Sequence, residues 1–245
     1  MTVILHDFEA RTRLAVKSYW STLASQASRQ ISGTERADHG NRSAVTGGKQ
    51  MDGFCSVVRQ VLHDNGMADA EIFQDFRLEL PGYFRPTKKW DMLVLRQRIL
   101  VAAIEFKSQR GPSFGNNLNN RAEEAVGVAH DILVAYREKA FGETAPRPWL
   151  GWLMLVEDCP ESQRPVAVSE PHFRVFPEFR KSSYARRYEL LLRKLRLEKL
   201  FDSTALLLAC QDDAETGAYR EPAPDLEMRQ FLASLGGHVG ALAAS

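Results

Sequence analysis

Two carboxylates and one amine interrupt an apolar stretch near the middle of the chain. In residues 90–107, WDMLVLRQRILVAAIEFK, Asp91, Glu105 and Lys107 stand where a buried strand would carry apolar side chains. Two carboxylates held close together repel each other unless a cation or a shared proton intervenes. Carboxylate oxygens suit Mg²⁺, and a neighbouring lysine can orient or deprotonate a water. These residues predict a site in which Asp91 and Glu105 hold a hard divalent cation such as Mg²⁺ beside Lys107.

A β-hairpin is the element that must bring these residues together. We expect strands at about 90–95 and 99–106, joined by the polar triplet 96–98, which has no Gly, Pro or Asn. If the hairpin folds about Arg98, Asp91 stands opposite Glu105, at roughly 4.5–5.5 Å. Lys107 shares the face of Glu105 because side chains alternate along a strand. The alternative interpretation is an edge hairpin whose Glu105 and Lys107 form only a surface ion pair.

The spacing Asp-x13-Glu-x-Lys is the one that PD-(D/E)xK nucleases use. Residues 90–131, WDMLVLRQRILVAAIEFKSQRGPSFGNNLNNRAEEAVGVAHD, resemble the core of the XhoI family of type II restriction endonucleases, and the order of segments extends the resemblance over essentially the whole chain. It implies a Mg²⁺-dependent homodimer that cuts double-stranded DNA at CTCGAG, with Asp91, Glu105 and Lys107 in the family's catalytic positions. The metal ligands would then be Asp91, Glu105 and the Phe106 backbone carbonyl. It also implies a bacterial, cytoplasmic protein with a cognate DNA methyltransferase as its genetic partner. Trp90 stands where the wider motif has Pro, which weakens the motif's specificity and leaves its chemistry unchanged.

Two other functions stay open at this stage. The chain could be another metal nuclease of the same fold, such as a repair or junction-cleaving enzyme, or a DNA-binding protein that keeps the fold without catalysis. The intact Asp, Glu and Lys argue against the second.

The composition is that of an ordinary globular protein. Lys plus Arg is 32 and Asp plus Glu is 31, so the net charge of +1 does not itself indicate nucleic-acid binding, which needs only local positive potential. The three cysteines lie far apart without a CxxC pattern, which predicts free thiols rather than a zinc site or disulfides. No apolar run reaches the roughly 18 residues of a membrane span.

We expect a single α/β domain with a mixed central sheet flanked by helices, like the restriction-endonuclease core. It would have a helical part at 1–66, a catalytic core at about 67–160 and a basic, closing part at 161–245. The patterns predict helices at 6–31, 49–64, 121–139, about 182–200 and 226–235, further strands at 71–80, 149–156 and 204–210, and loops at 32–48, 81–89, 108–120 and 212–224. Asn119 or Asn120 would cap the helix at 121, Glu123 and Glu124 would lie in its first turn, and the tail from Gly236 would be loose.

Candidate DNA contacts flank the hairpin and recur on a later basic helix. Arg and Lys bind phosphate, Arg pairs with guanine, and Asn or Gln pairs with adenine. The loop after Lys107 is rich in such side chains, although Asn-rich turns also occur for conformational reasons. The predicted contacts are Lys88, Lys89, Gln109, Arg110, Asn116, Asn117, Asn119, Asn120, Arg186 and Arg187.

Overall fold

A five-stranded mixed sheet forms the centre of the molecule. The computed structural model describes residues 2–31 and 49–243, so the loop predicted at 32–48 lies outside the described residues. The strand order is β1-β4-β5-β6-β7; the first two pairings are antiparallel and the last two parallel. The bounds are β1 (Ile72–Phe73), β4 (Met92–Arg96), β5 (Ile99–Gln109), β6 (Trp149–Glu157) and β7 (Ser203–Ala209). The predicted α/β class with a mixed central sheet is confirmed.

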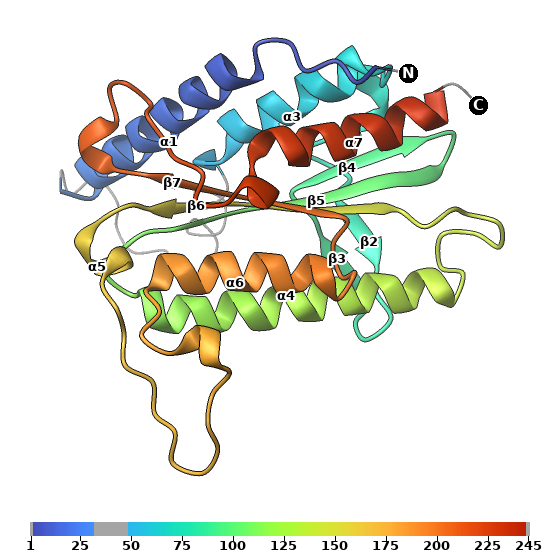
Figure 1. Ribbon diagram of the computed structural model, residues 1–245. Helices are drawn as coiled ribbons and strands as arrows, with labels where there is room; N and C mark the ends of the chain where they lie inside the picture. The colour runs from blue at the N-terminus through green and yellow to red at the C-terminus, as the bar shows by residue number, and fades with distance from the viewer. Residues whose placement is uncertain (1, 32–48, 244–245) are drawn as a thin grey trace.

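Helices cover both faces of this sheet (Figure 1). One face carries α1 (Phe8–Ile31), α3 (Asp52–Asp64) and α7 (Met228–Ala243), and the other carries α4 (Phe114–Arg137) and α6 (Tyr184–Leu197), with the short α5 (Pro160–Gln163) before α6. Alternate strand side chains enter opposite cores: Ile104 and Phe106 pack with α1, α3 and α7, whereas Ala103 and Trp152 pack with α4 and α6. None of the described helices is both long and apolar enough to cross a membrane.

The β4–β5 hairpin closes through a two-residue turn, Gln97–Arg98. Both residues have positive φ, 49° and 67°, as a type I′ turn requires. Arg96 pairs with Ile99, so it belongs to the strand rather than to the turn. Next to the turn, Leu95 lies opposite Leu100. A β-bulge between Val94 and Leu95 then inserts one extra residue in β5, so that Met92 lies opposite Ile104. With this bulge the register agrees with the prediction, because the pair of positions that follows Met92 and Ile104 is Asp91 and Glu105.

The strand predicted at 71–80 is wrong. Only 72–73 joins the main sheet, and 79–81 pairs instead with 87–89 in a separate hairpin, made of β2 (Glu79–Pro81) and β3 (Thr87–Lys89). Arg77 has a φ of 57°, which breaks the extended chain between the two pieces. The loop predicted at 81–89 therefore holds one strand of this small sheet.

The predicted loop at 108–120 is also wrong over most of its length. Strand β5 continues to Gln109, and α4 begins at Phe114, with Ser113 rather than Asn119 or Asn120 at the N-cap position. Phe114 is 1% exposed and stacks on Tyr184, with ring centroids 5.8 Å apart. Burial of this ring outweighs the weak helix propensity of the asparagines that follow it.

The tail from Gly236 continues helix α7 to Ala243 and is not loose over that range. A Cβ on Gly236 would lie 2.6 Å from Val3 Cγ1, so the glycine allows the N-terminal segment to pack closely against the helix.

Candidate active site

The structure brings Asp91, Glu105 and Lys107 to one point beside the β4–β5 hairpin. Lys107 Nζ lies 3.3 Å from Asp91 Oδ2 and contacts Glu105 Oε2 as an ion pair. Both carboxylates therefore reach a single position, which the ammonium nitrogen fills. Asp91 and Glu105 are therefore the side chains that would hold a metal ion here.

Asp91 is oriented by the backbone of β5. Strand β4 pairs with β5 only as far as Met92 and Ile104, and beyond that pair Asp91 Oδ2 accepts the Phe106 N–H at 2.8 Å. The Asp91 carboxylate thus accepts the hydrogen bond that a backbone carbonyl would accept if β4 continued. Because the N–H and C=O of a strand residue point to the same edge, the Phe106 carbonyl faces this edge too.

Glu105 is a fully buried acid held between two lysines. Its side chain is 0% exposed, with Lys88 Nζ 2.7 Å from Oε1 and Lys107 at Oε2. Burial raises the pKa of Glu105 and Asp91 adds to the rise, against the opposing effect of Lys107 and Lys88. A buried carboxylate of this kind is costly unless a cation compensates it.

Lys107 is charged despite its burial. Burial lowers its pKa, but Glu105, Asp91 and Glu124 together raise it above the usual value for lysine. The ammonium also lies 5.6 Å from the centroid of the Trp152 ring, on which it gains a cation–π interaction.

Glu124 of helix α4 is a third acid at this point. Its Oε1 lies 3.3 Å from Lys107 Nζ, and its other oxygen is bound by Arg121. Burial would raise the pKa of Glu124, but Lys107 and Arg121 hold it below its usual range. The prediction that Glu124 lies in the first helical turn is wrong, since α4 begins ten residues earlier at Phe114.

The donor atoms suit a hard divalent cation. Two carboxylates and a backbone carbonyl are all oxygen ligands, and Mg²⁺ is commonly held by one or two carboxylates together with water and substrate phosphate. Within residues 2–31 and 49–243, no three His, Cys, Asp or Glu side chains gather closely enough to hold a metal unaided.

A hollow of about 530 Å³ opens beside these residues, and we call it the catalytic hollow. Its charged lining combines four lysines with three aspartates: Lys49, Lys88, Lys89, Lys107, Asp52, Asp75 and Asp91. Burial, followed by Asp91, Asp52 and Asp75, raises the pKa of Cys55 in its wall, so this group is an uncharged thiol and a poor nucleophile.

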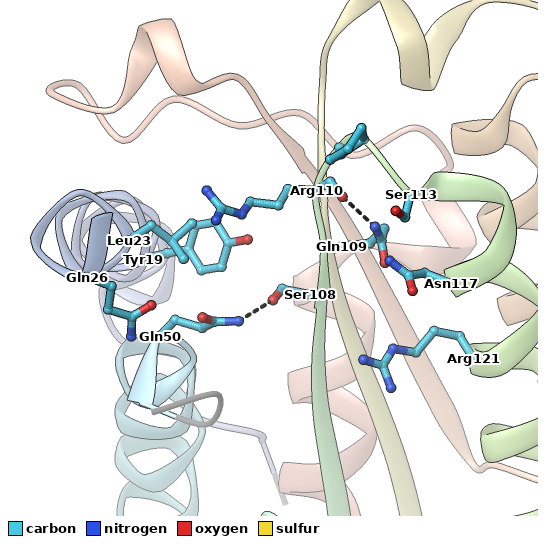
Figure 2. Close-up of a pocket in the computed structure, with 12 residues that line it drawn as sticks. Tyr19, Leu23, Gln26, Gln50, Ser108, Gln109, Arg110, Ser113, Asn117 and Arg121 are labelled. Atoms are coloured by element: carbon cyan, nitrogen blue, oxygen red, sulfur yellow. Dashed lines mark hydrogen bonds between the residues drawn. The ribbon is translucent and has the colours of Figure 1, made fainter. Parts of the chain in front are cut away.

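The predicted DNA contacts separate into groups. Lys88 and Lys89 line the catalytic hollow, whereas Gln109, Arg110 and Asn117 line a second hollow of about 350 Å³ (Figure 2). Asn116, Asn119 and Asn120 are exposed on α4 and line neither hollow. The second hollow also contains Gln50 and Arg121, which sequence reasoning missed because nothing local marks them as neighbours of the hairpin.

Arg186 and Arg187 make contacts within the chain. Arg186 pairs with Glu189, and Arg187 donates to Ser182 Oγ at 3.0 Å and to the Val166 carbonyl at 2.9 Å. Arg187 thereby closes the base of the long loop between α5 and α6 that extends away from the sheet in Figure 1.

Comparison with known proteins gives one consistent result. The family model described as restriction endonuclease XhoI matches residues 29–221. The type II restriction enzyme BstVI of Geobacillus stearothermophilus is 54% identical over 212 residues, covering 84% of this chain and 94% of that enzyme. The type II restriction enzyme XhoI of Xanthomonas vasicola is 49% identical, covering 81% of this chain and 79% of its own, and AbrI of Azospirillum brasilense is 52% identical, covering 71% and 78%. No solved structure matches the chain.

Proposed function

Because the chain belongs to the XhoI family of type II restriction endonucleases, we propose that it cuts both strands of duplex DNA within the palindrome CTCGAG, using Asp91, Glu105 and Lys107. The chain is a type II restriction enzyme, so its substrate is DNA. The observation that supports the site assignment is the convergence of both carboxylates on the Lys107 ammonium at the edge of the sheet.

In this proposal Asp91, Glu105 and the Phe106 carbonyl would hold Mg²⁺, which when bound would supply Lewis-acid chemistry toward the scissile phosphate and its attacking water. Lys107 faces the same point and donates hydrogen bonds to a phosphate oxygen or to the attacking water. Its positive charge balances the negative charge that develops on the phosphate as water adds and the bond to the leaving sugar oxygen breaks. Lys88 balances the charge of the buried Glu105 and also lines the catalytic hollow, where the phosphate would bind.

The remaining parts of the proposal follow from the family and the fold. A palindromic target favours a two-fold symmetric homodimer with one active site per strand. One sheet with an apolar core on each face supports a single domain over residues 1–245. Membership of a restriction system supports a bacterial cytoplasmic enzyme with a cognate DNA methyltransferase.

Digestion of a plasmid that carries one CTCGAG site tests the function. We expect the wild type to yield one linear band in Mg²⁺ and none in EDTA, and Asp91→Ala and Lys107→Ala to lose roughly 10³-fold or more of the cleavage rate while still shifting the duplex in a gel. Arg137→Ala, an exposed change at the end of α4, is the matched control and should cut normally.

The other possible outcomes identify the alternatives. A junction or repair enzyme would leave the linear duplex intact and cut branched or damaged DNA. A binding protein would shift the duplex without cutting it in any metal. Undiminished cutting by Asp91→Ala or Lys107→Ala would refute the assignment of the site.

A further inference from the structure

The second hollow, which we call the amide pocket, lies at the carboxyl end of β5. The end of β5 and its following loop lie between Tyr19 and Gln26 of α1 on one side and Asn117 and Arg121 of α4 on the other (Figure 2). Gln50, just before α3, projects into it toward the strand. Segments that are distant in the sequence therefore share one polar hollow.

The chemistry of the lining differs sharply from that of the catalytic hollow. No Asp or Glu is among the described residues that line the amide pocket. Its amide and guanidinium side chains are those of Gln26, Gln50, Gln109, Asn117, Arg110 and Arg121, and hydroxyl groups complete the polar lining. Such a set does not suit a metal cation, but it matches the edges of nucleobases, to which Asn, Gln and Arg make paired hydrogen bonds.

Several of these groups are held in place before any DNA arrives. The Gln50 amide donates from Nε2 to Ser108 Oγ at 2.9 Å, and the Gln109 amide donates to the Arg110 carbonyl. The Gly111 N–H is bound by Glu157 Oε2 at 2.9 Å, which fixes the loop that follows β5. Groups with fixed orientation lose less entropy on binding and discriminate better between partners.

The amide pocket is adjacent to the catalytic residues along β5. Ser108 and Gln109 directly follow Lys107, and a strand advances roughly 3.3 Å per residue, close to the spacing of bases along one DNA strand. Arg121 is also joined to the catalytic point, since it binds Glu124, which contacts Lys107. A phosphate at Lys107 would therefore lie next to this pocket.

We propose that the amide pocket reads base edges next to the scissile phosphate, with Gln50 and Arg121 as specificity-determining residues. The proposal rests on the proposed nuclease function and deepens it. Arg121 supplies the planar donor pair suited to a guanine, and Gln50 supplies the donor and acceptor suited to an adenine.

The test measures discrimination rather than activity alone. We would determine kcat/KM for Gln50→Leu and Arg121→Lys on the wild-type cleavage site and on duplexes that each carry one changed base pair. Arg121→Lys keeps the positive charge but removes the pair of parallel N–H donors of the guanidinium group. The panel is built on the site found by sequencing the ends that the wild type produces, so an error in the assumed CTCGAG does not affect the result.

Each variant should lose discrimination at one symmetric position of the site, by roughly 5- to 150-fold, and keep it elsewhere. Binding of the same duplexes without metal, followed by fluorescence anisotropy, should show the same positional loss. Gln60→Leu on α3 and Arg137→Lys on α4 are matched controls outside both hollows and should keep full discrimination. Thermal melting confirms that each variant is folded.

Two results would overturn the inference. Discrimination that stays within twofold of wild type in both variants would show that the pocket reads no base. An equal loss on every duplex, with a shallower salt dependence, would make these residues phosphate contacts instead. A wild type that cuts no DNA would refute the proposed function itself. That outcome is distinguishable from failure of the pocket inference, because the latter is seen only in the variants.

Discussion

Lys107 lies at the centre of the proposed catalytic site. Three carboxylates, from Asp91, Glu105 and Glu124, surround its ammonium group. Lys88 also pairs with Glu105, and Arg121 with Glu124, so the acids of the cluster are matched by cations. Buried ion pairs of this kind contribute little to stability, because the loss of hydration offsets the attraction. The cluster is therefore better explained by catalysis than by folding.

Glu124 should act as a positioning residue for Lys107. Glu124→Gln removes one of the acids that hold the ammonium in place, so we expect kcat to fall about tenfold with little change in KM, a loss of roughly 1.4 kcal/mol of transition-state stabilisation. Glu124→Asp, which keeps the charge, should recover part of the rate. Steady-state kinetics on a short duplex measures both, with the exposed neighbour Glu123→Gln as control. Equal kinetics in Glu124→Gln and the wild type would exclude this role.

The β4–β5 hairpin shows how one element sets the geometry of the site. With the two-residue turn alone, Asp91 would fall level with Ile104, and the bulge at Val94/Leu95 moves it level with Glu105. Shifting a strand by one residue turns each side chain to the opposite face, so the bulge is required for the two acids to meet.

The turn itself is strained, and relieving it should stabilise the protein. Gln97 and Arg98 both have positive φ without being Gly or Asn, and Gln97→Asn with Arg98→Gly provides the residues that a type I′ turn favours. We expect the free energy of unfolding to rise by about 1 kcal/mol with no change in cleavage, as measured by urea denaturation. Arg137→Gly, at the end of helix α4, should instead destabilise, which separates turn chemistry from a general effect of glycine. A lower midpoint for the turn variant would contradict the prediction.

Asp131 fastens the β2–β3 hairpin to helix α4. Its side chain is 5% exposed; it accepts the N–H groups of Tyr83 at 2.7 Å and Phe84 at 2.9 Å, and it pairs with Arg85 Nε at 2.7 Å. The same hairpin carries Lys88 to Glu105, so this anchor on α4 supports the active site from a distance.

This anchor should make stability depend on pH in a defined direction. Burial would raise the pKa of Asp131, but the Phe84 N–H, Arg85 and the Tyr83 N–H lower it below the ordinary 3.8. An acid whose pKa is lowered by folding stabilises the protein above its ordinary pKa, and this contribution disappears as the pH falls through the lowered value. Asp131→Asn should therefore cost about 2 kcal/mol near pH 7 and progressively less below pH 3.8, measured by urea unfolding at several pH values. The exposed Asp212→Asn is the control, and a penalty independent of pH would refute the anchor's charge dependence.

At the scale of the molecule, the protein has little net positive charge, and four of its lysines lie together beside the candidate site. The net charge is only +1, and the catalytic hollow gathers four lysines, Lys49, Lys88, Lys89 and Lys107, beside Asp52, Asp75 and Asp91. The basic residues of α6 are largely neutralised, as in the pairs of Arg193 with Asp225 and of Lys194 with Glu178. The placement of these lysines beside the candidate site, rather than the total charge, is what would hold a phosphate group there.

The enzyme should act as a dimer. The palindrome proposed as the target favours a dimer with two equivalent active sites, so sedimentation of the protein should give about twice the 27.6 kDa of one chain. Lys107→Ala mixed with the wild type on a one-site plasmid should leave nicked circles, because mixed dimers cut only one strand. A monomer in sedimentation both alone and on DNA would contradict this prediction.

Local patterns were most informative where the chemistry and the periodicity coincide. The apolar strands with Asp91, Glu105 and Lys107 were predictable because alternation and spacing place them on one face. The start of α4 was not predictable, because the Asn-rich residues after Phe114 favour a loop. The helix is stabilised there by packing of the Phe114 ring on Tyr184, a contact that the local sequence does not reveal. Arg77 likewise broke a strand that its alternating neighbours favoured.

The sequence by itself determined which residues can do the chemistry and that a hairpin carries two of the acids, because strand periodicity and the Asp-x13-Glu-x-Lys spacing are local properties of the chain. Only the tertiary structure decided that Glu124 contacts Lys107 and that Gln50 binds Ser108, 58 residues away. Contacts of this kind depend on how α4 and α3 pack on the sheet. That packing is settled by the burial of apolar side chains from the whole molecule, and no short stretch of sequence contains it.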